Sequence, residues 1–212
     1  TRIVNSAGQP VADITRRFVL APNSYDITIE QRITNLSGQA LSVRWTQYGP
    51  GDLEVDRSRY IDRRRFRYGY LLPPSDDPSR TLVTSDDNDL LVERSTIFKQ
   101  AQVGGALDEA TIWPNKVSTK AGYVLSWFGS TNRYFALAVH PLLPDPATSS
   151  HALSGVVERI EAIASGPDES TGRLFTNLYS PTVSVAPGQT LNLDMAAFAG
   201  PLDPDLLEEV EA

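Results

Sequence analysis

Strict alternation of apolar and polar side chains is the feature that most constrains the fold of this chain. In residues 24–35, SYDITIEQRITN, apolar side chains occupy every second position from 25 to 33 except Gln31, and those between them are charged or hydroxylated. The apolar members are Tyr25, Ile27, Ile29 and Ile33. A period of two is typical of a β-strand that is buried on one face. The same alternation recurs in residues 40–49 and 190–197, whereas helical periodicity is rare, so the sequence predicts a mostly β protein.

About ten segments have the length and composition of strands. Besides 24–35 and 40–49 they are Thr15–Leu20, Leu90–Arg94, Tyr123–Phe128, Arg133–His140, Gly155–Ala164, Leu174–Ser180, Thr182–Val185 and Gln189–Phe198. No βαβ crossovers separate them, which favours antiparallel pairing in a sandwich or a barrel. The turn sequence at residues 35–38, NLSG, predicts that the strands on either side of it pair as a hairpin.

Bulk composition favours one folded domain and argues against some functions. The 212 residues are 41% apolar and 21% charged, which is ordinary for a globular protein. The net charge of −7 opposes phosphate backbones, so we expect no nucleic-acid partner. The chain has no cysteine, which excludes disulfides, thiolate nucleophiles and cysteine-ligated metals.

Residues 50–119 differ from the rest because they are polar, charged and rich in turn residues. We expect long loops and short strands there. The most unusual part is residues 57–70, RSRYIDRRRFRYGY, in which arginines alternate with aromatic side chains. Three interpretations stay open: an edge strand whose arginines pair with acidic loops, a surface that contacts a protein or anionic lipid, or a stacking site for single-stranded nucleic acid. The candidate partner or lipid contacts are Arg57, Arg59, Arg63, Arg64, Arg65, Arg67, Tyr68 and Tyr70.

Catalytic signatures are weak. The two histidines, His140 and His151, could form an acid–base pair with Glu158 or Glu161, as sugar epimerisation requires, but their spacing does not demand it. Gly104-Gly105 lacks the lysine and hydroxyl residue of a phosphate loop, and no nucleophile elbow or zinc-protease motif occurs. We therefore predict no catalytic residue and no cofactor.

Two acidic clusters, SDD at 75–77 and SDDND at 85–89, could offer carboxylate oxygens to calcium. They lack the ligand spacing of a calcium loop, so solvated turns are the better interpretation and no metal site is predicted. At the carboxyl end, Asp203 and Pro204 suit the first positions of a helix. Glutamates gather where the helix dipole disfavours them, so we expect the helix of residues 203–212 to continue in a larger protein.

Three collinear stretches resemble the extracytoplasmic domain of the YidC membrane-protein insertase family. They are GYVLSWFGSTNRYFALAVHP at 122–141, VAPGQTLNLDMAAFAGPLDPDLLEE at 185–209 and, more weakly, ITRRFVLAPNSYDITIEQRITNLSGQALSVRWTQYGPGDL at 14–53. The shared features are a Gly-aromatic start, a Tyr-Phe strand ending in proline, and a Pro-Gly-Gln turn followed by a strand, Gly-Pro and a helix. Residues 50–119 depart from the family in length and charge, so the arginines cannot be carried over as a family site.

The resemblance implies an all-β supersandwich of two large, mostly antiparallel sheets, similar to galactose mutarotase domains. It implies one extracytoplasmic domain over residues 1–212, whose terminal helix leads to the bacterial inner membrane and whose body faces the periplasm. In that setting Tyr134, Phe135, Leu137 and Val139 would contribute to sheet packing, and His140-Pro141 would end a strand.

The function implied by the resemblance is non-catalytic contact with Sec translocon components or inserting membrane proteins. Contact with an anionic membrane surface stays open, and the full-length protein would be embedded in the membrane. The alternative is an aldose-epimerase-like enzyme or carbohydrate-binding module on the same fold, because a shared fold does not fix function.

Overall fold

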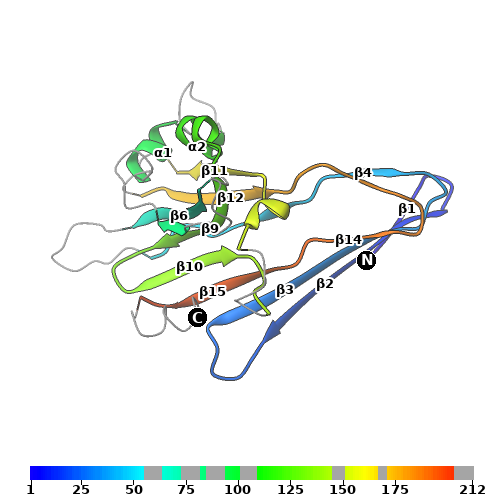
Figure 1. The fold of residues 1–212 in the computed structure, drawn as a ribbon, viewed down its shortest axis with the longest axis horizontal. Helices are drawn as coiled ribbons and strands as arrows, with labels where there is room; N and C mark the ends of the chain where they lie inside the picture. Colours follow the sequence, from blue (N-terminus) through cyan, green and yellow to red (C-terminus); the bar gives the residue numbers. More distant parts are fainter. Residues whose placement is uncertain are drawn as a thin grey trace.

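A computed structural model describes residues 1–54, 64–72, 82–84, 94–100, 109–144, 151–166 and 171–202. Its largest element is a nine-stranded antiparallel sheet (Figure 1). In spatial order its strands are β1 (Arg2–Val4), β2 (Pro10–Leu20), β3 (Asp26–Asn35), β15 (Met195–Pro201), β10 (Phe135–His140), β9 (Val124–Thr131), β6 (Arg65–Leu71) and β7 (Leu82–Thr84), with β14 (Thr190–Asn192) also paired to β3.

A second layer packs against one face of this main sheet. Its four strands are β5 (Thr46–Tyr48), β12 (Arg173–Tyr179), β11 (Arg159–Ser165) and β8 (Glu109–Trp113). Among the described residues, two short α-helices, α1 (Arg94–Gln100) and α2 (Lys116–Ala121), lie at the end of the molecule that holds this layer, and a 3₁₀ turn spans Leu153–Gly155. The predicted all-β, mostly antiparallel sandwich is confirmed.

A transverse row of paired residues shows how the main sheet builds the core. Ile27, Ala197, Val139, Phe128 and Tyr68 are successive register partners across β3, β15, β10, β9 and β6. Residues that are directly paired in adjacent strands share a face of the sheet. Burial deepens along the row, from half-buried at Ile27 to fully buried at Phe128 and Tyr68. The core therefore lies under the β9–β6 side of the sheet.

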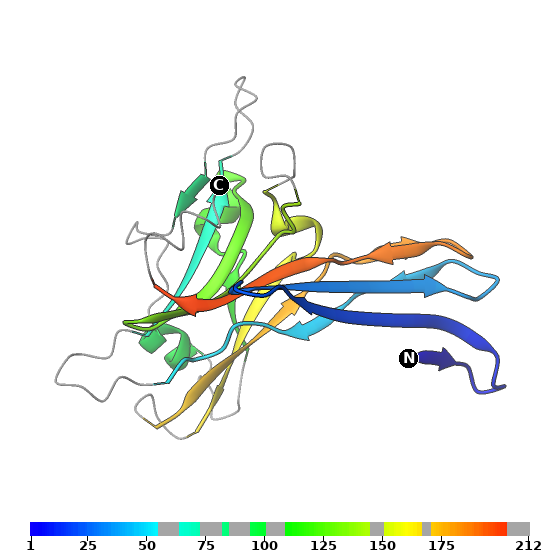
Figure 2. The same cartoon turned by 90° about the horizontal axis from the view of Figure 1, so that it is seen from below.

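The opposite side of the molecule is a thin arm, seen at the right of Figures 1 and 2. It comprises β1, the adjoining parts of β2 and β3, β14, and a two-stranded sheet of β4 (Leu41–Val43) with β13 (Val183–Val185). A separate small core of Ala12, Ile33 and Leu193 holds it. All three residues of β1 are exposed, so the arm has far less buried apolar area than the body.

The structure corrects several expectations. Residues 40–49 form no hairpin with β3, because β2 occupies one edge of β3 while β15 and β14 occupy the other. They divide instead into β4, which pairs with β13, and β5, which pairs with β12. Of the predicted strand Leu90–Arg94, only Arg94 is described, and it begins α1.

Residues 50–119 are more regular than expected where the structure describes them. They include β6, β7, β8, α1 and the start of α2. The predicted helix at residues 203–212 lies outside the described residues. Among those that are described, no helix is long and apolar enough to span a bilayer.

Candidate functional site

The arginine-rich stretch enters the main sheet as β6, between β9 and β7. Phe66, Tyr68 and Tyr70 face the second layer and are buried, while Arg65 and Arg67 alternate with them and are half-buried. The edge-strand interpretation is therefore wrong for this part, since β6 has a neighbour on each side and an apolar face that needs cover.

The eight candidate contact residues consequently separate into groups. Arg64, Tyr68 and Tyr70 are buried, which is incompatible with a role in a contact surface. Arg65 and Arg67 retain partial exposure, so a contact there stays a prediction. The remaining three, Arg57, Arg59 and Arg63, lie outside the described residues.

Tyr68 is tied to the helix beside it. The Nδ2 atom of Asn115 donates a hydrogen bond to the Tyr68 hydroxyl at 2.9 Å. Asn115 is itself fixed as the N-cap of α2, where its side chain accepts from the Ser118 amide. Burial raises the pKa of Tyr68 to about 12, with the Asn115 hydrogen bond acting in the opposite direction. Tyr68 is thus a neutral structural group in the sheet interior.

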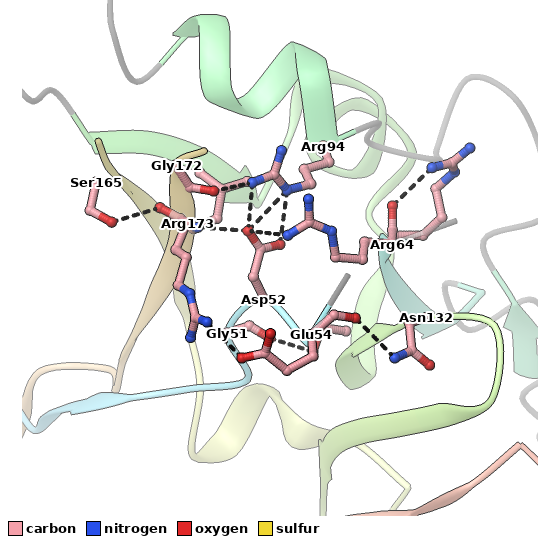
Figure 3. A network of polar contacts seen from close by, with 12 residues as sticks. Gly51, Asp52, Glu54, Arg64, Arg94, Asn132, Ser165, Gly172 and Arg173 are labelled. Carbon is pink, nitrogen blue, oxygen red and sulfur yellow. Dashed lines mark hydrogen bonds and ion pairs between the residues drawn. The ribbon is translucent and has the colours of Figure 1, made fainter. Parts of the chain in front are cut away.

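The buried carboxylate of Asp52 is the centre of a polar cluster that we call the Asp52 network (Figure 3). The Nε atom of Arg94 donates to both Asp52 carboxylate oxygens, at 3.1 and 2.9 Å. The Nη1 atom of Arg64 lies 3.6 Å from Asp52 Oδ2. All three side chains are at most 6% exposed.

Backbone groups complete the network. The amide of Leu174 donates to Asp52 Oδ2 at 2.8 Å, and the Asp52 amide donates to the Leu174 carbonyl at 2.9 Å. Arg94 Nη2 donates to the Gly172 carbonyl at 2.6 Å. Asp52 thereby joins the loop after β5, the start of β6, helix α1 and strand β12. The site is a structural clamp, because its carboxylate is saturated by protein donors.

Sequence reasoning missed this clamp. Asp52 occurs in a Gly-Pro-Gly-Asp stretch that is typical of an exposed turn, and Arg94 is the last residue of the predicted strand Leu90–Arg94. The contacts join residues 42 and 122 positions apart, and no local pattern indicates such partners. Nearer to solvent, Glu54 accepts from Arg173 Nη2 at 2.6 Å, and its side chain is 80% exposed.

The acid–base pair that the histidines could form with Glu158 or Glu161 is not seen among the described contacts. His140 Nε2 lies 3.4 Å from Asp26 Oδ1, and its Nδ1 lies 3.0 Å from the Pro141 carbonyl. Glu158 pairs with Arg44, and Glu161 pairs with Arg159, each at 2.9 Å. His151 lies in the segment before the 3₁₀ turn and is half-buried.

Metal ligands are not gathered in the part of the chain that the structure describes. No group of three or more histidine, aspartate or glutamate side chains there could hold a metal ion. The acidic clusters at 75–77 and 85–89 fall outside the described residues, so their interpretation as solvated turns stays a prediction.

An exposed aromatic surface, by contrast, lies at one end of the main sheet. We call it the aromatic rim, and it consists of Tyr25, Tyr134, Phe135 and Leu202. Their exposed fractions are 44%, 52%, 53% and 38%. The expectation that Tyr134 and Phe135 pack in the core is wrong, whereas Val139, farther along β10, is buried. The core beneath the sheet covers Val139 but does not reach the start of the strand.

Comparisons with known proteins give a family and a fold. The family described as the YidC periplasmic domain matches residues 77–212. No match was found among curated protein sequences.

Two solved structures share the architecture. One is a galactose mutarotase related enzyme from Lactobacillus acidophilus, with a TM-score of 0.52 and 11% identity over 89% of this chain and 61% of that protein. The other is a galactose mutarotase-like protein from Lactobacillus casei, with a TM-score of 0.51 and 5% identity over 89% of this chain and 63% of that protein. The chain thus spans less than two thirds of either protein. Because the sequence identities are this low, the similarity shows a shared fold alone. That similarity confirms the predicted galactose-mutarotase-like fold.

Proposed function

The chain belongs to the family of the YidC periplasmic domain, and from that premise we propose that it is a non-catalytic interaction module of a membrane-protein insertase. Its partners would be Sec translocon components or membrane proteins during insertion. The whole protein would sit in the bacterial inner membrane, with this extracytoplasmic domain on the periplasmic side.

The observation that carries the proposal is the family match, which covers residues 77–212 and therefore most of the two-layer body. The chemistry of the described residues supports it. The Asp52 network is buried and saturated by protein donors, as a structural element would be. Several exposed aromatic side chains, by contrast, lie at or next to strand ends where another molecule can reach them: Tyr25, Tyr48, Tyr134 and Phe135.

Site-specific photo-crosslinking tests the proposal. A photoreactive amino acid would replace Arg65, Tyr48 or Phe175 in the full-length protein, expressed in its own host. We expect adducts with translocon subunits or nascent membrane proteins from at least one position. Replacement of the buried Phe128 gives the matched control, because a side chain inside the core should capture no partner. Uniform absence of adducts from exposed positions would contradict the proposal.

The arginine contact needs a narrower test, because Arg64 belongs to the Asp52 network and its replacement would disturb the fold. We propose the double change Arg65→Ser and Arg67→Ser, which leaves the buried face of β6 intact. If these arginines contact a protein partner or anionic lipid, the double variant should bind that partner more weakly, and its binding should depend less on salt concentration. Unchanged binding would leave them as a half-buried polar face of the sheet.

An aldose-epimerase-like or carbohydrate-binding role is the second candidate. Two observations favour it: the mutarotase-like fold and the position of His140 beside Asp26. Catalysis of mutarotation would require these groups to reach a sugar. We expect the purified chain to leave the rate of α-to-β interconversion of glucose and galactose unchanged. A rate increase that His140→Ala abolishes would favour the enzyme instead.

A further inference from the structure

We propose that the aromatic rim is a membrane-contacting surface that seats this end of the domain in the headgroup region of a phospholipid bilayer. The inference goes beyond the proposed protein contacts and uses different residues from the arginine-rich stretch. It rests on how the rim is built, on the chemistry of its side chains and on the charge of the segments around it.

The rim is one continuous structure at the ends of three neighbouring strands. The amide of Leu202 donates to the Tyr134 carbonyl at 2.7 Å, and Phe135 is the register partner of Pro201. The amide of Ala199 donates to the Tyr25 carbonyl at 2.9 Å, which places Tyr25 beside the same strand.

Gly200 makes room for the Tyr25 ring. A Cβ atom there would lie 2.8 Å from Tyr25 Cγ and 2.7 Å from Phe198 Cζ. The Tyr25 and Phe198 rings are 6.2 Å apart, so a buried aromatic supports the exposed one. Backbone pairing and packing therefore hold the rim in place on the sheet.

The side chains of the rim suit the boundary between water and lipid. Tyrosine has an apolar ring and a polar hydroxyl, and such amphipathic rings concentrate at the headgroup level of bilayers. Phe135 and Leu202 are purely apolar, and each exposes more than a third of its surface. Insertion of these groups into the acyl boundary would remove apolar area from water.

Basic side chains lie on two of the three segments that build the rim. Segments 14–25, 127–144 and 195–202 contain no aspartate or glutamate, in a chain whose net charge is −7. They carry Arg16, Arg17 and Arg133. The Arg133 guanidinium lies 5.4 Å from the centre of the Tyr134 ring.

The carboxylates that follow these segments in β3 already have basic neighbours. Asp26 lies beside His140, and Glu30 lies 3.5 Å from Arg17 and 3.9 Å from Arg32. The rim itself is thus apolar. Its neighbouring carboxylates are Asp26, which follows Tyr25, Asp203, which follows Leu202, and Glu54, whose carbonyl accepts from Asn132 Nδ2 at 3.3 Å. The apolar side chains and Arg133 would therefore make the contact with the headgroup region.

The position of the rim also favours a broad surface over a small ligand. The turn between β9 and β10 and the end of β15 lie at the same extremity of the main sheet, opposite the arm (Figures 1 and 2). Side chains at an outer extremity can meet a bilayer together, without a cleft to receive them.

Vesicle flotation with the intact chain tests the proposal. The probe is phosphatidylethanolamine vesicles that contain phosphatidylglycerol, and neutral phosphatidylcholine vesicles provide the comparison. We expect the chain to float with the anionic vesicles, and the double variant Tyr134→Ser, Phe135→Ser to bind about tenfold more weakly.

A matched control uses Tyr48→Ser with Phe175→Ser. These aromatics are 82% and 45% exposed but belong to the second layer. The control variant should bind within about twofold of the unmodified chain, since its changes leave the four side chains of the rim in place. Circular dichroism of both variants checks that each retains the β fold.

A tryptophan reporter provides a second test that does not rely on a disruptive substitution, because it keeps an aromatic side chain at position 135. In Phe135→Trp, the new indole should be quenched by brominated acyl chains when vesicles are added, whereas the indole of Tyr48→Trp should not. The proposal is overturned if the unmodified chain does not float, if the rim and control variants bind equally, or if the indole at position 135 stays unquenched on bound protein. Failure of flotation with retained translocon crosslinks would overturn the membrane contact of the rim and leave the proposed function standing.

Discussion

Individual side chains divide into those that hold the domain together and those that face outward. Asp52 is the clearest structural residue, because one carboxylate engages Arg64, Arg94 and the backbone of Leu174. Buried charge of this kind is costly to disturb, since the partners left behind lose a counter-charge in a low-dielectric setting.

Replacement of Asp52 should therefore destabilise the domain strongly. We expect Asp52→Asn to lower the free energy of unfolding by about 3–5 kcal/mol in urea titrations. Glu54→Gln is the matched control, because Glu54 is 80% exposed and its pair with Arg173 should contribute at most about 1 kcal/mol. Equal losses in the two variants would show that burial of the network contributes little.

Tyr68 should make stability fall at alkaline pH. The folded state keeps its proton to a pKa of about 12, whereas an unfolded chain releases it near 10.0. Below the unfolded-state pKa, Tyr68 has no effect on the pH dependence of stability. Between the unfolded-state and folded-state pKa values the free energy of unfolding falls as pH rises, because only the unfolded state loses the proton there. Absorbance at 295 nm should show a late-titrating tyrosine that Tyr68→Phe removes. The same late transition in the variant would assign the shift to another tyrosine.

At the scale of elements, β6 and β9 show how close packing fixes a strand pair. Gly69 and Trp127 are register partners, and the indole lies directly over the glycine. A Cβ atom at Gly69 would overlap the Trp127 ring, so Gly69→Ala should cost about 1–3 kcal/mol and change the Trp127 environment.

Gly38→Ala provides the control for this change. No atom lies within 4 Å of the Cβ position at Gly38. Its effect on the midpoint of thermal unfolding should therefore be small. Fluorescence and thermal unfolding of both variants measure the difference, and similar midpoints would show that the indole moves aside easily.

The same scale shows what sequence patterns can predict. Alternation correctly predicted that residues 26–35 form a strand, because a period of two can be read from neighbouring residues alone. The burial of this strand alternates only in the second half, where Gln31, Ile33 and Asn35 are buried. Alternation could not predict the partner of the next strand: β4 meets β13 about 140 positions later, and only the assembled sheet makes that pairing.

Prediction of the candidate site was poorer for a related physical reason. An apolar stripe indicates that one face of a strand can be buried. Whether its side chains are buried depends on how far the second layer extends beneath the strand. Tyr134 and Val139 therefore belong to one apolar run and differ in burial. The arginine-rich stretch was likewise expected at the surface, because its charge hides the apolar alternation of Phe66, Tyr68 and Tyr70.

For the molecule as a whole, the two unequal cores predict unequal resistance to opening. The arm depends on the small cluster of Ala12, Ile33 and Leu193, whereas the body has a much larger buried set. Regions with few buried apolar contacts open at lower free-energy cost.

Hydrogen exchange should reveal this difference. We expect backbone amides in the first half of β2 to exchange faster than those in β9. Leu193→Ala should accelerate exchange in β2, β3 and β14 while β9 changes less. Leu125→Ala, at a fully buried position in β9, is the contrasting variant and should lower protection throughout the body. A uniform response to both changes would show that arm and body unfold together.

The position of β15 has a consequence for how the domain is made. This strand leaves the ribosome after every other described strand, yet it sits between β3 and β10. Until it arrives, the nascent chain displays two unsatisfied sheet edges that can capture foreign strands. Assembly of the main sheet thus ends when β15 pairs with both strands. A chain truncated before Met195 would be unable to complete that sheet.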